Sequence, residues 1–432
     1  MRLTFFGGAQ EVGRAAMLLE EGNRNILLDC GIKLGEKTEY PLLDDSELRR
    51  INNVTVSHAH LDHSGYLPHL YSKKARPKIY LTKPTRDLVG VLLSDYYRIR
   101  RMKREPAIFS AKDIDNVMKD AIITEYNEPV NTDFKLTFFP AGHIMGSAIT
   151  ALEADGKRIV YSGDICMRKT RVLDACTRNL SAETLIVEST YGEKDKLLPS
   201  YKESYQKMVR IINETLDKGG HVVIPSFAVG RAQEVLLALD DYMRSGSIRP
   251  TRIYIEGMIG KAMKIYRHNA IYANDDIKRR ILMSEDDPFK SPNFHKPKSK
   301  TREDVLEEPS IIITTSGMLT GGPVMFYLEK LGTDPKNTLI FCGYQAAGTT
   351  GSRVLAGERR LRIGDREIEL KMRVESVKIS GHADFNELLQ FIKSFKGLKK
   401  VFLMHGEKAD LKDYLEKDYE VEVPRLLDTY SI

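Results

Sequence analysis

The sequence predicts a mixed α/β protein in which one β-rich domain is interrupted by an inserted parallel α/β domain. Three observations carry this prediction. Short strand-like runs separated by Gly and Asn turns fill the chain up to about residue 190. From there, longer helical stretches alternate with buried-looking strands, which is typical of a parallel sheet. After about residue 357, short strand-like runs return.

The N-terminal series contains eight expected strands. They are residues 2–6, 16–20, 25–29, 53–57, 78–81, 135–139, 149–154 and 158–162. Between the fifth and sixth, the stretch from Thr85 to about Arg104 has apolar residues at helical spacing, and Thr85 is the expected N-cap. Such a series of short strands suggests stacked sheets.

The middle of the chain contains strands that lead through loops into helices. These expected strands are residues 221–227, 311–315 and 338–341, and the expected helices are 234–243 and 324–331. The chain then ends with a helix at 385–395 and a strand at 400–404. We therefore expect residues 1–192 and 357–432 to form the first domain and residues 193–356 to form the insertion.

Composition excludes several classes of protein. With 432 residues, 42% hydrophobic and 29% charged, the chain is neither disordered nor collagen-like nor a coiled coil. It contains neither a membrane-length apolar run nor a signal peptide, so we expect a cytoplasmic protein without a membrane partner. The four cysteines lack CxxC spacing, which leaves His and carboxylate side chains as the candidate metal ligands.

A formal charge of +6 permits a polyanionic partner without requiring one. Three local basic runs are more suggestive. They are residues 98–104, then Lys296, Lys298, Lys300 and Arg302, then Arg359, Arg360 and Arg362. Such runs are usually solvated surface and less often phosphate contacts.

The most informative motif is the run His58-Ala59-His60-Leu61-Asp62-His63. A strand precedes it, so His58 and His60, two residues apart, point to the same side of an extended segment. Imidazole and carboxylate ligands without thiolate suit zinc best, with manganese or iron as weaker alternatives. Further polar residues follow expected strands and complete the candidate set: Asp29, His143, Asp164 and His405.

The order of these residues resembles the metallo-β-lactamase superfamily. Residues 188–192 (ESTYG), 380–384 (SGHAD) and 404–407 (MHGE) resemble three motifs of its β-CASP nuclease branch. The chain is most similar to archaeal cleavage and polyadenylation specificity factor homologues, on the evidence of residues 58–69, residues 82–88 and Tyr191. We expect it to lack the KH domains of longer members. The resemblance spans essentially the whole chain and implies a metallo-β-lactamase αββα sandwich with an inserted parallel α/β β-CASP domain.

The resemblance also implies a site for two zinc ions per chain. It assigns His58, His60 and His143 to the first zinc, Asp62, His63 and His405 to the second, and Asp164 to a bridging position, with Asp29 orienting a ligand from behind. The implied catalytic set is His382, Glu188 and Asp62, in which His382 is the general acid and Glu188 fixes its tautomer. A hydroxide activated between the two metals would attack the RNA phosphodiester. RNA-cutting members of the family tend to carry His at the position of His405, where DNA-cutting members carry an apolar residue, so His405 favours RNA as the substrate.

The insertion is expected to hold the substrate through helix N-termini and glycine-rich loops, which bind phosphate through N–H groups. The candidate residues are Ser226, Arg231, Ser316, Gly317, Gly343, Tyr344 and Gly348. The alternative is that these glycines only permit tight turns of the backbone. The expected partners are single-stranded RNA, a second copy of the chain in a homodimer, and other RNA-processing proteins.

Four functions remain open from the sequence. An endoribonuclease in RNA 3′-end processing or turnover is the first choice, and a 5′-to-3′ exoribonuclease of the RNase J type is the main alternative. A small-molecule metallohydrolase would need neither the insertion nor Glu188 and His382. An inactive scaffold subunit would be expected to have lost ligands, but every expected ligand position is filled.

Overall fold

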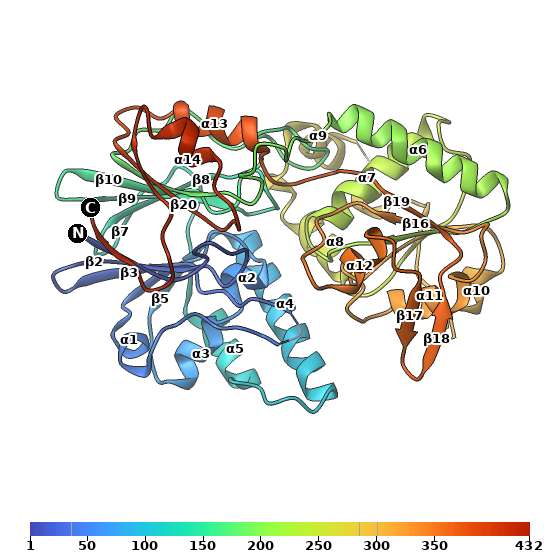
Figure 1. Ribbon diagram of the computed structural model, residues 1–432, viewed down its shortest axis with the longest axis horizontal. Helices are drawn as coiled ribbons and strands as arrows, with labels where there is room; N and C mark the ends of the chain where they lie inside the picture. The colour runs from blue at the N-terminus through green and yellow to red at the C-terminus, as the bar shows by residue number, and fades with distance from the viewer. Residues whose placement is uncertain (36, 285, 300) are drawn as a thin grey trace. The chain divides into compact units, whose positions relative to one another are not determined.

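The protein is described by a computed structural model that covers residues 1–35, 37–284, 286–299 and 301–432 (Figure 1). Lys300, a member of the second basic run, lies outside the described residues. The chain forms two compact units. The first comprises Met1–Lys169, Leu173–Leu197 and His382–Ile432, and the second comprises Thr170–Val172 and Leu198–Gly381. The predicted α/β fold, a β-rich domain interrupted by an insertion, is confirmed.

The second compact unit extends to Gly381, past residue 356, where the insertion was expected to end. Strand β19 (Arg373–Ser376) pairs in parallel with β16 (Thr338–Phe341), so it forms the edge of the sheet in the second unit. The hairpin formed by β17 (Arg360–Ile363) and β18 (Arg366–Glu369) packs Leu361 into the core of the same unit. The short strand-like runs between residues 357 and 381 therefore pack in the second unit.

Two seven-stranded sheets form the first unit. The first sheet has the order β22-β1-β2-β3-β4-β5-β6 and the second has the order β21-β20-β11-β10-β9-β8-β7. The strands of the first sheet are β1 (Arg2–Gly7), β2 (Ala16–Glu21), β3 (Arg24–Leu28), β4 (Asn53–Thr55), β5 (Lys78–Leu81), β6 (Ala121–Ile123) and β22 (Thr429–Ser431). Those of the second sheet are β7 (Val130–Asn131), β8 (Lys135–Pro140), β9 (Ala148–Ala154), β10 (Lys157–Tyr161), β11 (Thr184–Glu188), β20 (Lys400–Met404) and β21 (Glu420–Glu422).

Helices on the outer faces complete an αββα sandwich (Figure 1). The helices beside the first sheet are α1 (Asp45–Arg50), α2 (Leu61–Ser64), α3 (Leu67–Ser72), α4 (Lys83–Met102) and α5 (Ala111–Asp120), and those beside the second are α13 (Phe385–Lys393) and α14 (Leu411–Leu415). Between the sheets, Phe5, Phe138 and Phe402 are fully buried. Full burial of each such side chain contributes roughly 1.5–3 kcal/mol.

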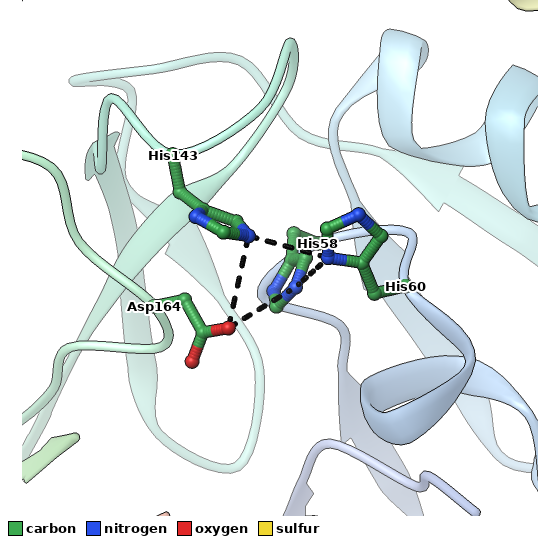
Figure 2. A group of neighbouring side chains, drawn as sticks. All are labelled: His58, His60, His143 and Asp164. Carbon is green, nitrogen blue, oxygen red and sulfur yellow. Dashed lines mark hydrogen bonds and ion pairs between the residues drawn. The ribbon is translucent and has the colours of Figure 1, made fainter. Parts of the chain in front are cut away.

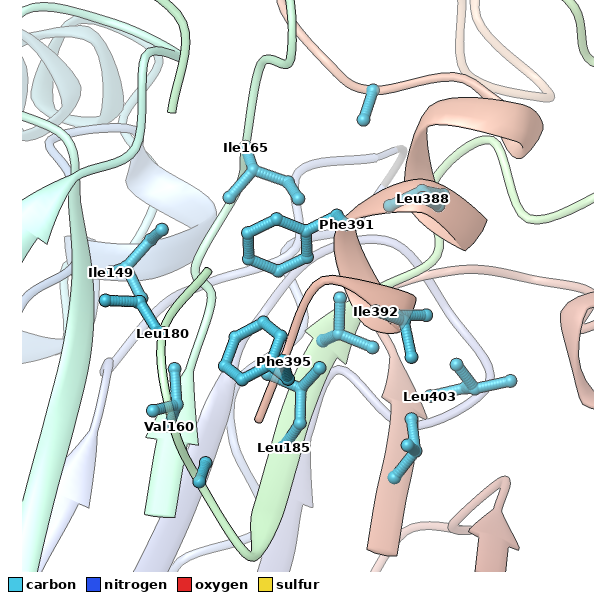
Figure 3. Close-up of a cluster of buried hydrophobic side chains, with 14 of the residues drawn as sticks. Ile149, Val160, Ile165, Leu180, Leu185, Leu388, Phe391, Ile392, Phe395 and Leu403 are labelled. Carbon is cyan, nitrogen blue, oxygen red and sulfur yellow. The ribbon is translucent and has the colours of Figure 1, made fainter. Parts of the chain in front are cut away.

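Helix α13 packs on the second sheet through apolar residues three and four positions apart. Figure 3 shows Phe391 and Ile392 directed toward the strands that carry Val160 and Leu185. The helix begins after Asp384, whose side chain accepts a hydrogen bond from the Glu387 amide while Glu387 caps the Asp384 amide in return. This reciprocal cap fixes the chain two residues after His382.

The N-cap predicted for α4 was wrong. Thr82, not Thr85, is the N-cap, and its hydroxyl accepts a hydrogen bond from the Thr85 amide. Pro84 lies in the first turn, where a helix does not need the missing N–H group. Both threonine hydroxyls donate to the carbonyl of Gly146, at 2.8 and 2.9 Å, so the helix starts against the loop that follows His143.

A six-stranded parallel sheet forms the centre of the second unit, in the order β14-β13-β15-β12-β16-β19. Its remaining strands are β12 (Val222–Pro225), β13 (Ile253–Ile255), β14 (Phe294–His295) and β15 (Ile311–Thr314). The accompanying helices are α6 (Tyr201–Asp217), α7 (Arg231–Arg244), α8 (Ile259–His268), α9 (Asp275–Met283), α10 (Glu303–Leu306), α11 (Val324–Leu331) and α12 (Thr350–Leu355), with short 3-10 turns η1 (Ala270–Tyr272) and η2 (Pro288–Lys290). Strands β12, β15 and β16 are buried along their whole length, as expected for a sheet covered on both faces. Within the described ranges, no helix has the length and apolar character needed to cross a bilayer.

Candidate metal centre

The ten candidate residues of the first unit come from the ends of parallel strands and from the adjoining loops. Strands β3 and β4 are parallel neighbours in the first sheet, and β10, β11 and β20 are parallel neighbours in the second. Ten candidate residues end these strands, follow them, or lie in a nearby helix or loop. They are Asp29, His58, His60, Asp62, His63, His143, Asp164, Glu188, His382 and His405. Parallel strands end at the same edge of a sheet, so each sheet delivers several of these side chains to one place.

The first group of ligand atoms consists of His58, His60, His143 and Asp164 (Figure 2). The Nδ1 atom of His60 lies 3.1 Å from Nε2 of His58 and 3.2 Å from Nε2 of His143. Asp164 Oδ2 lies 3.6 and 3.7 Å from the same Nε2 atoms. Donors bound tetrahedrally to zinc at about 2.0–2.1 Å lie about 3.3–3.4 Å apart, so the group has the size of a zinc site.

The second group consists of His63, Asp164 and His405, and Asp62 lies beside both histidines. His63 Nε2 lies 3.5 Å from Asp164 Oδ2 and 3.9 Å from Asp62 Oδ2. His405 Nε2 lies 3.5 Å from Asp62 Oδ2, and its Nδ1 atom lies 3.4 Å from Asp164 Oδ1. Because Asp164 belongs to both groups, its carboxylate is in the position of a shared ligand.

Three buried atoms of these groups have no hydrogen-bond partner among the described residues: His63 Nε2, His405 Nε2 and Asp164 Oδ1. Buried polar atoms without a partner are rare, because each costs its desolvation free energy. Cations bound by the two groups would satisfy these atoms. The residues present therefore fit metal ions without any rearrangement of the fold.

Asp29 orients His63 from the side away from these groups. Its carboxylate oxygens accept hydrogen bonds from His63 Nδ1 at 2.7 Å, the Tyr161 hydroxyl at 2.6 Å and the amide and hydroxyl of Ser57 at 2.7 Å each. With Nδ1 engaged, Nε2 of His63 is left for a metal. Burial lowers the pKa of His63, but Asp164, Asp62 and Asp29 outweigh it and raise that pKa to about 10.

We expect Asp29→Asn to weaken metal binding by about 10–100-fold, because it removes the charge that orients His63. Asparagine tolerates the positive φ of 59° at this position, so the backbone is preserved. Metal titration followed by calorimetry measures the affinity. Tyr161→Phe, which removes one of the neighbouring hydrogen bonds and no charge, is the matched control and should change the affinity less. Equal affinities for wild type and Asp29→Asn would contradict this role.

His382 lies beside the metal ligands and is bound to Glu188. Its Nδ1 atom lies 3.0 and 3.2 Å from the two Glu188 carboxylate oxygens and 3.9 Å from Asp164 Oδ2. Burial raises the pKa of Glu188, but His382, the Thr190 hydroxyl and the Ile165 amide lower it by more, so the pKa lies below its ordinary value. With Nδ1 facing Glu188, the other ring nitrogen, Nε2, lies on the opposite side of the ring.

The segment that follows Asp164 holds this pair in place. The Ile165 amide donates to Glu188 at 2.7 Å, and its carbonyl accepts from the Ala383 amide at 2.8 Å. Arg168 donates to Asp384 at 2.7 Å and to Glu387 at 2.5 Å, the two residues that cap α13. Arg168, Ser57 and Tyr161 were not among the residues predicted from the sequence. Only their positions beside His58 and Asp164 could have singled them out.

The candidate RNA-binding residues of the second unit lie along the carboxyl ends of its parallel strands. Ser226 follows β12, Ser316 and Gly317 follow β15, and Gly343 and Tyr344 follow β16. A Cβ atom on Gly317 would come within 3.0 Å of the backbone between residues 226 and 227, so these loops touch.

The other two candidates in the second unit differ from one another. Arg231 begins α7, and Cys342 follows β16. Burial raises the pKa of the Cys342 thiol to about 12, and the charge of Arg231 opposes part of that rise. Gly348 has a φ of 80° with open space around it, which matches the turn alternative. Phosphate contact by these residues stays a prediction.

Three family models match successive parts of the chain. The metallo-beta-lactamase superfamily domain matches residues 18–190 and the Beta-Casp domain matches residues 232–354. A Zn-dependent metallo-hydrolase RNA specificity domain matches residues 367–424. Together they cover both units of the structure.

Several archaeal relatives match along nearly the whole chain. Transcription termination factor FttA of Methanothermobacter thermautotrophicus is 38% identical over 100% of this chain and 72% of its own length. The FttA proteins of Methanocaldococcus jannaschii and Thermococcus kodakarensis are 37% and 36% identical, over 96% and 100% of this chain and 68% and 71% of their own lengths.

The fold also matches a solved structure, a protein of unknown function from Enterococcus faecalis. That match has a TM-score of 0.60 and 14% identity over 99% of both chains, which shows a shared fold. The family models and the FttA relatives confirm the resemblance seen in the sequence. The chain belongs to the β-CASP family of the metallo-β-lactamase superfamily and is a metal-dependent RNA hydrolase related to the archaeal transcription termination factor FttA.

Proposed function

We propose that this protein is an endoribonuclease that cuts single-stranded RNA with two zinc ions and thereby forms RNA 3′ ends. The proposal rests on one observation. Two groups of candidate ligands have Asp164 in common, and the hydrogen-bonded residues His382 and Glu188 lie beside them. The relatives' name, transcription termination factor, supports a role in ending transcripts. A growing RNA has its 3′ end inside the polymerase, so an internal cut is the direct way to release it.

In the proposed site, His58, His60 and His143 would hold one zinc ion, Asp62, His63 and His405 would hold the other, and Asp164 would contribute to both. When bound, the two ions supply a water of lowered pKa and positive charge for the phosphate oxygens. Asp29 keeps Nε2 of His63 directed at its ion. The fixed ligands and the buried carboxylates preserve this geometry without reorganisation during the reaction.

His382 donates a proton from Nε2 to the leaving O3′ atom, while Glu188 holds the Nδ1–H group. The water releases one proton to solvent and attacks as hydroxide, so the bond between phosphorus and O3′ breaks as the bond between phosphorus and the hydroxide oxygen forms. His382 then regains a proton from solvent. The products are a 3′-hydroxyl and a 5′-phosphate end. This assignment is supported by the hydrogen bond between His382 and Glu188, which occupies Nδ1 of His382. His382 also forms a candidate metal group with Asp164 and Glu188, so the metal content of His382→Ala tests the assignment.

We expect Arg168→Ala to lower kcat by about 10–100-fold while KM and metal content stay unchanged. The reason is that Arg168 holds the two acidic residues that follow His382, and displacement of a catalytic group by about 1 Å costs about 100-fold. Arg168→Lys, which keeps the charge but not the two-sided geometry, should recover part of the activity. Kinetics with His382→Ala as the second change give the decisive comparison. Because Arg168 acts through His382, the double variant should be no slower than His382→Ala, and independent losses that multiply would contradict the role.

The test of the proposed function compares a circular single-stranded RNA with a linear RNA of the same sequence carrying a labelled 5′-monophosphate. An endonuclease opens the circle and releases internal fragments, whereas an exonuclease of the RNase J type needs an end and releases labelled mononucleotides from the linear RNA alone. His382→Ala serves as the inactive control. Cleavage of neither RNA by zinc-loaded protein would favour the small-molecule hydrolase or the scaffold subunit.

Homodimerisation, a cytoplasmic location and further RNA-processing partners belong to the same proposal. Light scattering after gel filtration measures the mass in solution, and one chain mass of 49.1 kDa at micromolar concentration would contradict the homodimer.

A further inference from the structure

The basic run at residues 98–104 differs from the other two runs in its surroundings. In the second run, Arg302 is paired with Glu256 at 2.5 Å. In the third run, the β17–β18 hairpin and its flanks interleave the arginines with acidic residues: Glu358, Asp365, Glu367 and Glu369. The first run lies at the C-terminal end of α4 and in the segment that follows it. Residues 97–105 contain five basic residues and one acidic residue, which gives a net charge of +4.

Only some of these basic residues form ion pairs with nearby carboxylates. Arg98 is paired with Asp95, and Arg100 lies 3.3 Å from Glu105. Within the part of the chain that the structure describes, no carboxylate lies within 4 Å of Arg101, Lys103 or Arg104. Cations in the last turn stabilise a helix through its dipole, but this effect falls off within that turn. Helix stabilisation therefore does not account for Lys103 and Arg104, which follow the helix.

The same surface also presents an aromatic ring and exposed apolar atoms. Tyr97, Arg98, Arg101 and Met102 line a shallow depression of about 380 Å³. The Arg101 guanidinium lies 5.9 Å from the centre of the Tyr97 ring, and Met102 is 72% exposed. Proteins that bind single-stranded nucleic acid combine basic groups for the phosphates with aromatic and apolar surfaces for the bases.

The helix connects this surface to the catalytic centre. Its N-terminal residues Thr82 and Thr85 bind the Gly146 carbonyl, three residues after His143. Twenty helical residues span about 30 Å, so the basic end lies about that far along the helix from the His143 loop. In Figure 1, α4 extends past α3 and α5, with its C-terminal turns at the margin of the first unit.

We propose that the α4 basic surface, defined as Tyr97, Arg98, Arg101, Met102, Lys103 and Arg104, binds the part of the RNA strand that extends away from the cut. The proposal rests on the proposed ribonuclease function and adds a second contact region for the same substrate. A stacked strand advances about 3.4 Å per nucleotide, so roughly nine nucleotides span the length of the helix. RNA that extends about ten nucleotides or more from the cut reaches the surface, and a hexamer does not.

The experiment uses the full chain with Arg101, Lys103 and Arg104 changed together to glutamine. The matched control changes three exposed lysines of the same unit on the α13–α14 side to glutamine: Lys396, Lys399 and Lys417. Fluorescence anisotropy measures the affinity for a 20-nucleotide RNA over a range of salt concentrations. Initial rates measure kcat/KM for this RNA and for a hexamer.

The α4 variant should bind the 20-nucleotide RNA at least about tenfold more weakly, and the slope of log affinity against log salt should fall by about 2, since each phosphate contact contributes about 0.7. Hexamer cleavage and the melting temperature should not change, and the control should bind like wild type. An equal loss in the control, or no loss in the α4 variant, would overturn the proposal. The proposal would also be overturned if the α4 variant lost binding to phosphatidylserine vesicles but bound RNA as tightly as wild type. If wild type cuts neither RNA, the proposed function fails, but the anisotropy result still tests the surface.

Discussion

Replacing Asp164 with asparagine is expected to release metal and to lower RNA cleavage by about a thousandfold or more. One carboxylate oxygen, Oδ2, lies 3.5–3.7 Å from the Nε2 atoms of His58, His63 and His143, and the other oxygen faces His405. Asparagine keeps the shape but loses the negative charge that both ligand groups share. Several kcal/mol of charge stabilisation would be lost, and each 1.4 kcal/mol corresponds to a tenfold rate change.

The measurement pairs metal content by mass spectrometry with the initial rate on a short single-stranded RNA. Asp418→Asn is the matched control, because that aspartate is 53% exposed on the surface and makes one ion pair with Lys393. The control should keep both metal and activity. A fully loaded and fully active Asp164→Asn protein would show that Asp164 is not a shared ligand.

Much of this centre could be predicted from sequence because its chemistry is concentrated in short segments. Four candidate ligands fall within residues 58–63, directly after a strand. Asp164 and His405 also follow strands, so the sheet topology brings them to the same place once the strands are identified. The fold class followed from the same strand pattern.

Other features depend on contacts between distant parts of the chain. Arg168 reaches Asp384 and Glu387, which lie 216 and 219 positions further along, and an isolated arginine gives no sign of such partners. The extension of the second unit beyond residue 356 was not predicted for a similar reason. The strand Arg373–Ser376 is only half buried, and its assignment depends on pairing with β16, which local sequence does not encode.

The N-cap of α4 is another feature that local sequence does not determine. Thr82 and Thr85 are both suitable N-cap residues, and the sequence alone does not distinguish them. In the structure, both hydroxyls donate to the Gly146 carbonyl, but only Thr82 precedes the helix and has an extended backbone. A contact with a loop about sixty residues away in sequence therefore accompanies the choice of start.

Replacing His382 with alanine is expected to leave the metal in place while lowering kcat on RNA by about 100–10,000-fold, the usual contribution of a general acid. His382 is bound to Glu188 through Nδ1, so on the proposed assignment its loss removes a proton donor and not a ligand. A substrate whose leaving atom needs no proton separates the two roles. On RNA with a 3′-sulfur at the cleavage site, His382→Ala should approach the wild-type rate, because a thiolate leaves without protonation.

His69→Ala, which removes a histidine hydrogen-bonded to the Ile108 carbonyl, is the matched control and should cut both RNAs normally. Loss of metal from His382→Ala would place this residue among the ligands, and an equally large defect on the sulfur substrate would rule it out as the proton donor.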